Sequence, residues 1–95
     1  MIAVNVRMDG ITIDGHAGYA EAGKDIVCAG VTALTENLID SIESLTKDTI
    51  QYEISPGRVD IYYMNLSEYA KLLVDSFFLG ISGIAQDFPE YVKII

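Results

Sequence analysis

The spacing of hydrophobic residues in this chain switches between the period of a strand and the period of a helix, and the order of these switches constrains the fold most. Large apolar residues alternate with small or polar ones over residues 2–8, the pattern of a half-buried strand. Asp9-Gly10 follows, a pair that favours a two-residue hairpin turn. Residues 11–17 return as a second strand, so the chain is expected to begin with a β-hairpin.

The register of this hairpin determines where His16, the only histidine, is expected to lie. A two-residue turn at the predicted position pairs Ala3 with His16, which places His16 on the polar face of the sheet near Asn5. A bend or bulge at Gly15 would change that placement. The register therefore matters for any chemistry that uses the histidine.

A loop and a long helix are expected next. Residues 18–25 are rich in glycine and small residues and lack a strand period, which predicts a mobile loop. Apolar residues then recur at helical spacing, so we expect a first helix from about residue 26 to about residue 46. Asp25 is a good N-cap for this helix, because its carboxylate can accept free backbone N–H groups.

The second half of the chain repeats the order of hairpin and helix. Residues 49–54 and 58–64 are expected to form strands around a Ser-Pro-Gly turn. Asn65 or Ser67 then caps a second helix, whose two glycines are expected to weaken its last turns, and residues 91–95 form a short last strand. The apolar stripe of the second helix is expected to be Tyr69, Leu72, Leu73, Phe77, Ile81 and Ile84.

Together these elements predict a single α+β domain over residues 1–95. The element order is ββαββαβ, with a mostly antiparallel sheet and two helices packed on one face of it. Hydrophobic residues make up 51% of the chain, which is high for a soluble domain. We expect part of this apolar surface to form a self-interface in a homodimer; a dense core with a few exposed apolar residues is the alternative.

The charge balance excludes some partners. Fourteen acidic residues outnumber six scattered basic ones, for a net charge of −8. Nucleic-acid binding needs clustered Lys and Arg, so we expect no direct nucleic-acid contact, whereas a basic peptide would suit an acidic surface.

The sequence shows neither a signal-peptide pattern nor an apolar run long enough for a membrane span. A single cysteine, which cannot form an internal disulfide, fits a reducing cytoplasm.

Cys28 is the only thiol of the chain, and its predicted position favours reactivity. With Asp25 as N-cap, Cys28 is the third residue of the first helix, near free backbone N–H groups and the positive end of the helix dipole. Both favour the thiolate, and the same N–H groups could stabilise an oxyanion. The alternative is a small buried apolar residue, which is how most free cysteines behave.

His16 is the base that such a thiol requires, because an imidazole can take its proton. The predicted loop after His16 is long enough to bring a strand end back to the helix start. Contact with Cys28 nevertheless requires the strand to end or bend at Gly15, since simple pairing points His16 to the opposite face. A surface or hydrogen-bonded histidine is the alternative.

Further groups could support this pair. A third residue would orient the imidazole, and the candidates are Asp25, Asp14 and Asn5; plain helix capping is the alternative for Asp25. Thr32 lies four residues after Cys28 on the same helix face, where its hydroxyl either supports the site or bonds the carbonyl of residue 28. One histidine and one cysteine do not make a four-ligand metal site, and the glycines form no phosphate-binding pattern, so no metal or cofactor is expected.

The chain contains the blocks Gly15-His16-Ala17-Gly18, Gly23-Lys24-Asp25-Ile26-Val27-Cys28-Ala29 and Val31-Thr32-Ala33-Leu34. In these blocks and over its whole length it resembles the bacterial ribosomal-processing cysteine protease family, Prp. The resemblance implies that His16 is the catalytic histidine, Cys28 the nucleophile and Asp25 the acidic residue three positions before it. Thr32 stands where many members have serine, and Gly30 stands where alanine is common.

The resemblance also implies a function. Members of this family remove a short N-terminal extension from large-subunit ribosomal protein twenty-seven during ribosome assembly, form homodimers and cover the site with a flexible loop. We therefore expect a cytoplasmic cysteine endopeptidase, a thiol protease whose partner is the N-terminal peptide of that ribosomal protein. The alternative is a non-catalytic peptide-binding or assembly module of the ribosome, in which Cys28 is a core residue.

Overall fold

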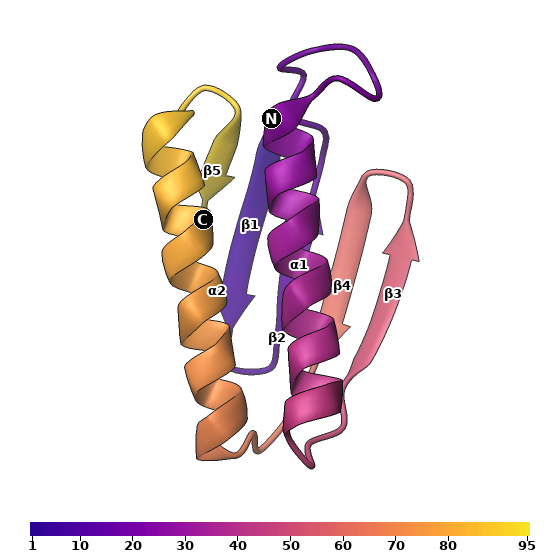
Figure 1. Ribbon diagram of the computed structural model, residues 1–95, viewed down its shortest axis with the longest axis vertical. Helices are drawn as coiled ribbons and strands as arrows, with labels where there is room; N and C mark the ends of the chain where they lie inside the picture. The colour runs from indigo at the N-terminus through magenta and orange to yellow at the C-terminus, as the bar shows by residue number, and fades with distance from the viewer.

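The computed structural model describes residues 1–95 and consists of one five-stranded sheet with both helices on the same face (Figure 1). Along the chain the elements are β1 (Ile2–Arg7), β2 (Gly10–Asp14), α1 (Ile26–Leu45), β3 (Gln51–Ser55), β4 (Arg58–Tyr62), α2 (Glu68–Asp87) and β5 (Val92–Ile94). The strands lie side by side in the order β3-β4-β2-β1-β5; the β1–β5 pair is parallel and the other pairs are antiparallel. The predicted α+β fold and the order ββαββαβ are confirmed. Neither helix is sufficiently long and apolar to cross a membrane.

The first hairpin forms as expected, but its turn lies one residue earlier than predicted. Arg7 pairs with Gly10, so Met8 and Asp9 form the turn. Gly10 belongs to β2 because the backbone of β4 passes close to it, and a side chain there would collide with the carbonyl of Ile61. The predicted register is therefore wrong by two residues, a shift that leaves the buried face of each strand unchanged.

Both helices begin where the sequence predicted. Asp25 is the N-cap of α1, and Ser67, one of the two expected candidates, is the N-cap of α2. The Ser67 hydroxyl accepts the N–H of Ala70 at 3.2 Å. Asp48 in turn accepts the N–H of Ser67 at 2.7 Å, and hydrogen bonding with Ser67 lowers the pKa of Asp48. The start of α2 is therefore tied to the segment between α1 and β3, which contains Asp48.

The helices cover the sheet with apolar faces that meet the strands and each other. Phe77 and Ile81 of the predicted apolar stripe of α2 are buried, whereas its prediction is wrong at Tyr69 and Leu72, which are 75% and 67% exposed. The smaller Ala70 and Val74 face the core instead, which rotates the buried stripe around the helix. The buried residues are Val27, Val31, Thr35, Leu38, Ile39 and Ile42 in α1 and Ala70, Val74, Phe77 and Ile81 in α2.

Glycine residues let the two helices approach each other closely. A Cβ on Gly80 would lie 2.9 Å from Leu34 Cδ1, and a Cβ on Gly30 would lie 3.3 Å from Ile84 Cδ1. α2 continues through both of its glycines to Asp87, so they do not end the helix. Packing of α2 against α1 offsets the low helix propensity of glycine.

The second hairpin extends the sheet beyond the area that the helices cover (Figure 1). β3 and β4 are joined by a turn at Pro56-Gly57, within the predicted Ser-Pro-Gly segment. Every residue of the edge strand β3 is exposed. Ile54 of β3 pairs with Val59 of β4 and shares the helix-side face with it, so apolar side chains lie uncovered next to α1.

Candidate active site

β2 ends at Asp14, and Gly15 turns the chain out of the sheet. Gly15 has a φ of +106°, which residues with a side chain rarely adopt, and its N–H donates to the carbonyl of Gly57 at 2.7 Å. His16 therefore does not continue the strand. The expected position of His16 beside Ala3 on the polar face is wrong, whereas the expected alternative, a bend at Gly15, is confirmed.

The side chain of His16 lies against the turn between β3 and β4. A Cβ added to Gly57 would be 2.7 Å from His16 Nε2 and 3.3 Å from both Cδ2 and Cε1, so the Nε2 end of the ring abuts the turn. The amino group of Met1 donates to the carbonyl of His16 and holds its backbone. The histidine remains exposed, so its ring is accessible from solvent.

Cys28 is the third residue of α1, as predicted, and it is half-buried. The backbone N–H of Ala17 donates to Cys28 Sγ at 3.4 Å. Because Ala17 follows His16 directly, this bond brings the only thiol and the only histidine to the same end of the molecule. Both side chains line one cavity of about 280 Å³, although they are not hydrogen-bonded to each other.

The cavity beside the thiol lies between α1 and the second hairpin and is largely apolar. Ile39 of α1 and Ile54 and Val59 of the hairpin are among its lining residues. A second hollow of about 810 Å³ lies under the loop of residues 18–25. The residues common to both hollows are His16, Cys28, Thr32 and Glu36. The thiol therefore lies where the two hollows meet.

Asp25 joins the loop to the start of α1. Its Oδ1 accepts the N–H groups of Val27 at 3.0 Å and Cys28 at 2.9 Å. Its Oδ2 accepts the N–H groups of Tyr19 at 3.0 Å and Ala20 at 3.4 Å. These bonds, foremost the one from Cys28, lower the pKa of Asp25. The expectation that the first turn offers free N–H groups to an oxyanion is therefore wrong for Val27 and Cys28.

None of the expected orienting residues hydrogen-bonds to the imidazole of His16. The carboxylate of Asp25 caps the helix and holds the loop, as described above. Asp14 forms an ion pair with Arg58 at 3.6 Å instead. Asn5 lies on the outer face of β1, which the helices do not cover. The imidazole therefore makes no hydrogen bond with any of the three expected orienting side chains.

Thr32 lies one helical turn after Cys28 and lines both hollows. The threonine hydroxyls that bond the carbonyl one turn earlier are those of Thr35 and Thr46; Thr32 makes no such bond. The expected bond from Thr32 to the carbonyl of residue 28 is therefore wrong, and its role in support of the site stays a prediction. The structure has no group of three or more His, Cys, Asp or Glu side chains that could hold a metal ion.

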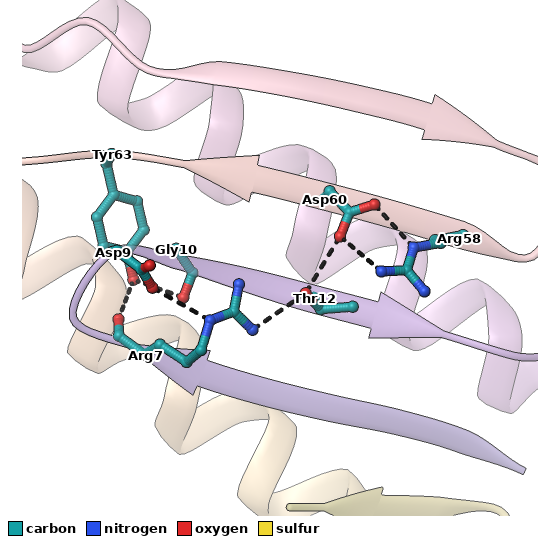
Figure 2. Close-up of polar contacts among 7 residues, drawn as sticks. All are labelled: Arg7, Asp9, Gly10, Thr12, Arg58, Asp60 and Tyr63. Atoms are coloured by element: carbon teal, nitrogen blue, oxygen red, sulfur yellow. Dashed lines mark hydrogen bonds and ion pairs between the residues drawn. The ribbon is translucent and has the colours of Figure 1, made fainter.

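Charged side chains on the outer face of the sheet hold the strands whose ends form the site (Figure 2). Asp60 of β4 accepts from Arg58 Nε at 2.8 Å and from the hydroxyl of Thr12 at 3.1 Å. Arg7 of β1 donates to the same hydroxyl at 3.1 Å. The hydrogen bond between Arg58 and Asp60 lowers the pKa of Asp60 and raises the pKa of Arg58. This network therefore links β1, β2 and β4.

Two features near the site had no clear signal in the sequence. Gly57 reaches His16 only through the pairing of β2 with β4, which local patterns do not reveal. Tyr19 belongs to the glycine-rich loop, yet its ring packs edge-to-face on Phe88 at 5.5 Å and on Tyr91 at 5.2 Å. These contacts tie the loop to the segment between α2 and β5.

The chain is similar in sequence to known cysteine proteases. Residues 1–93 match the family model described as cysteine protease Prp. The ribosomal processing cysteine protease Prp of Staphylococcus aureus (strain Mu50) is 26% identical over 91 residues, which cover 93% of this chain and 86% of that protein. The Bacillus subtilis (strain 168) protein of the same name is 25% identical over 87 residues, which cover 84% of this chain and 78% of that protein.

A solved structure shows the same fold. The crystal structure of an essential ribosomal processing protease Prp from S. aureus, in complex with a covalently linked product peptide, aligns with a TM-score of 0.93 and 25% identity. The alignment covers 99% of this chain and 97% of that one. These relatives are proteases, so the alternative of a non-catalytic binding module is set aside. The chain therefore belongs to the cysteine protease Prp family and is a cysteine protease.

Proposed function

We propose that this cysteine protease is an endopeptidase that removes the short N-terminal extension of large-subunit ribosomal protein twenty-seven during ribosome assembly. Its relatives are named as ribosomal processing proteases, and the S. aureus protein is known with a product peptide linked covalently. The observation that best supports the proposal is the bond from Ala17 N–H to Cys28 Sγ at 3.4 Å, which brings the thiol and His16 to one cavity.

His16 and Cys28 perform the proposed chemistry. The imidazole takes the proton of the thiol, and the thiolate attacks the carbonyl carbon of the peptide bond. His16 then protonates the leaving amine, and water hydrolyses the resulting thioester. The imidazole and the thiol are not hydrogen-bonded in the peptide-free structure, so we expect the pair to tighten when a peptide binds, as catalytic hydrogen bonds often do.

The backbone N–H of Ala17 is the donor best placed for the oxyanion. The nitrogen of this group lies 3.4 Å from Cys28 Sγ, and the sulfur is its only hydrogen-bond acceptor. When the sulfur bonds to the carbonyl carbon, the carbonyl oxygen develops negative charge next to that sulfur, and an N–H aimed at this region can stabilise it. Val27 and Cys28 do not offer their N–H groups, because Asp25 accepts both.

The two hollows accommodate an extended peptide on either side of the thiol. The cavity that Ile39, Ile54 and Val59 line suits apolar side chains of the peptide. A basic part of the peptide would suit a chain with a net charge of −8. The loop of residues 18–25 lies over the second hollow and is the segment that closes on the peptide and excludes water.

Exposed apolar residues on α2 support a homodimer. Tyr69, Leu72 and Leu79 are exposed and lie on one side of α2 at helical spacing. A second copy of the chain would bury this side across a two-fold axis, the commonest symmetry of oligomers. Sedimentation of Leu72→Glu and Leu79→Glu variants tests this surface; both are expected to be monomeric.

We place the protein in the cytoplasm, where ribosomes are assembled.

Mass spectrometry of a cleavage reaction tests the proposed activity. Under reducing conditions, the protein is expected to convert the ribosomal protein precursor into a shorter product and a released N-terminal peptide. Cys28→Ala is expected to bind the precursor and leave its mass unchanged, because the nucleophile is missing. An unchanged precursor mass with the wild-type protein would contradict the proposal.

A further inference from the structure

We propose that Gly57 is a positioning residue for His16, because the missing side chain in the Pro56-Gly57 turn provides the space that the imidazole occupies. The proposal rests on the proposed role of His16 as the base. It assigns a function to the β3–β4 hairpin, which is remote in sequence from the segments that contain His16 and Cys28.

The contact between the turn and the ring is direct. A Cβ on Gly57 would lie 2.7 Å from His16 Nε2, closer than the 3.0 Å that real Cβ atoms keep from other heavy atoms. The flanking ring atoms Cδ2 and Cε1 would both be at 3.3 Å, so the whole Nε2 end of the ring would be obstructed. Any side chain at this position must therefore displace either the imidazole or the turn.

The turn is anchored to the same strand end that presents the histidine. Gly57 has a φ of +73° and follows a proline, the pattern of a type II turn. Its carbonyl accepts the N–H of Gly15 at 2.7 Å. Arg58, the next residue, pairs in register with Asp14 and forms an ion pair with it at 3.6 Å. The turn is therefore fixed to Asp14 and Gly15, the two residues that precede His16.

Because the turn is held in this way, an added side chain at position 57 displaces the exposed imidazole rather than the hairpin. The imidazole must keep its reach to Cys28 for proton transfer, and a misplacement of about 1 Å at a catalytic group costs about 10²-fold in rate. We expect Gly57→Ala to lower kcat by about that factor with little change in KM, since the peptide-binding hollows keep their other walls.

The single histidine makes the contact measurable without any substrate. Its ring protons give the only imidazole signals of the chain. We expect nuclear Overhauser cross-peaks between these protons and the Hα protons of Gly57 in the wild-type protein, and shifted ring signals in Gly57→Ala. Absence of the cross-peaks in the folded wild-type protein would overturn the proposal, whether or not the protein cleaves the ribosomal precursor.

Asparagine separates the contact from backbone strain. Asn tolerates a positive φ better than Ala, but it adds the same Cβ next to the ring. We expect Gly57→Asn and Gly57→Ala to lose kcat to a similar extent; recovery of kcat in Gly57→Asn would assign the loss to strain and overturn the positioning role. Gly18→Ala measures the effect of strain alone on thermal unfolding, because Gly18 has a φ of +70° and open space around it.

Alkylation of Cys28 tests the same role if the ribosomal precursor is not the substrate. Gly57→Ala is expected to slow the reaction of Cys28 with iodoacetamide near neutral pH in the wild-type background. In a His16→Ala background the same substitution is expected to have no further effect, because the group that it displaces is gone. Equal slowing in both backgrounds would overturn the proposal.

Discussion

Asp25 accepts the backbone N–H of Cys28 at 2.9 Å with one carboxylate oxygen, and its other oxygen accepts the N–H of Tyr19 at 3.0 Å. A single side chain thus fixes the helix turn that contains the thiol and the loop that crosses the adjacent hollow. The same bonds lower the pKa of Asp25. The loop and the helix start are therefore one unit.

Replacement of Asp25 by Ala should loosen both segments. Loss of an N-cap typically lowers Tm by about 4–8 °C in a domain of this size, and the N–H groups of Tyr19 and Ala20 lose their acceptor as well. Thermal unfolding and limited proteolysis of residues 18–25 would measure the two effects. Asp40→Ala on the exposed side of α1 is the control, and an equal Tm shift in both variants would contradict the cap assignment.

Acid should destabilise the fold through three carboxylates. The pKa values of Asp25, Asp48 and Asp60 are all lowered from their ordinary value of 3.8 by hydrogen bonds in the folded state. Their stabilisation is complete above that value and is lost as the pH falls through the lower folded-state values. Urea unfolding measured at decreasing pH should therefore show a falling free energy of unfolding below about pH 4.

Asp60 allows this acid effect to be assigned. Its partner Thr12 lies on the neighbouring strand β2, and its partner Arg58 lies on β4 itself (Figure 2). Loss of both bonds in Asp60→Asn should lower stability at neutral pH and flatten the acid dependence. Asp40→Asn, on the exposed side of α1, is the control that removes one carboxylate without breaking a hydrogen bond of this network. A steeper acid dependence in Asp60→Asn would contradict the direction of its pKa shift.

His16 should matter for rate and little for stability. A general base contributes about 10²- to 10⁴-fold, so His16→Ala should lower kcat by that range. The side chain is exposed, and Tm should therefore stay close to that of the wild-type protein. Alkylation of Cys28 near neutral pH should slow in parallel. Unchanged kcat in a folded His16→Ala variant would exclude the imidazole as the base.

Two glycines of α2 differ in what a methyl group would meet. Gly83 is exposed with open space around it, so Gly83→Ala should stabilise the helix by about 1 kcal/mol. At Gly80 the methyl group would lie 2.9 Å from Leu34 Cδ1, and displacement of that packed side chain should cancel the gain, since overpacking costs about 1–3 kcal/mol. Urea unfolding compares the two variants, and equal stabilisation would show that the helices can separate without cost.

Local patterns predicted the elements because each has a distinct hydrophobic period and its own capping or turn residues. They failed where distant segments meet. The first hairpin turns one residue earlier than predicted, because Gly10 pairs with β4 at a place where a side chain would collide with the carbonyl of Ile61. Capping correctly placed Cys28 in the first turn of α1, but the same cap uses the N–H groups that an oxyanion would need. The proximity of Gly57 to His16 depends on the pairing of β2 with β4, which no short motif specifies.

Tyr19 should control how readily the loop opens. Its edge-to-face contacts with Phe88 and Tyr91 are each worth about 0.5–1.5 kcal/mol, so Tyr19→Ala should increase the open population about tenfold. Lys24 lies in the same loop and provides a trypsin site whose cleavage rate in the native protein measures this opening. Tyr62→Ala, at an exposed position on β4, is the matched control and should leave cleavage at Lys24 unchanged. Equal cleavage in both variants would mean that Asp25 alone holds the loop.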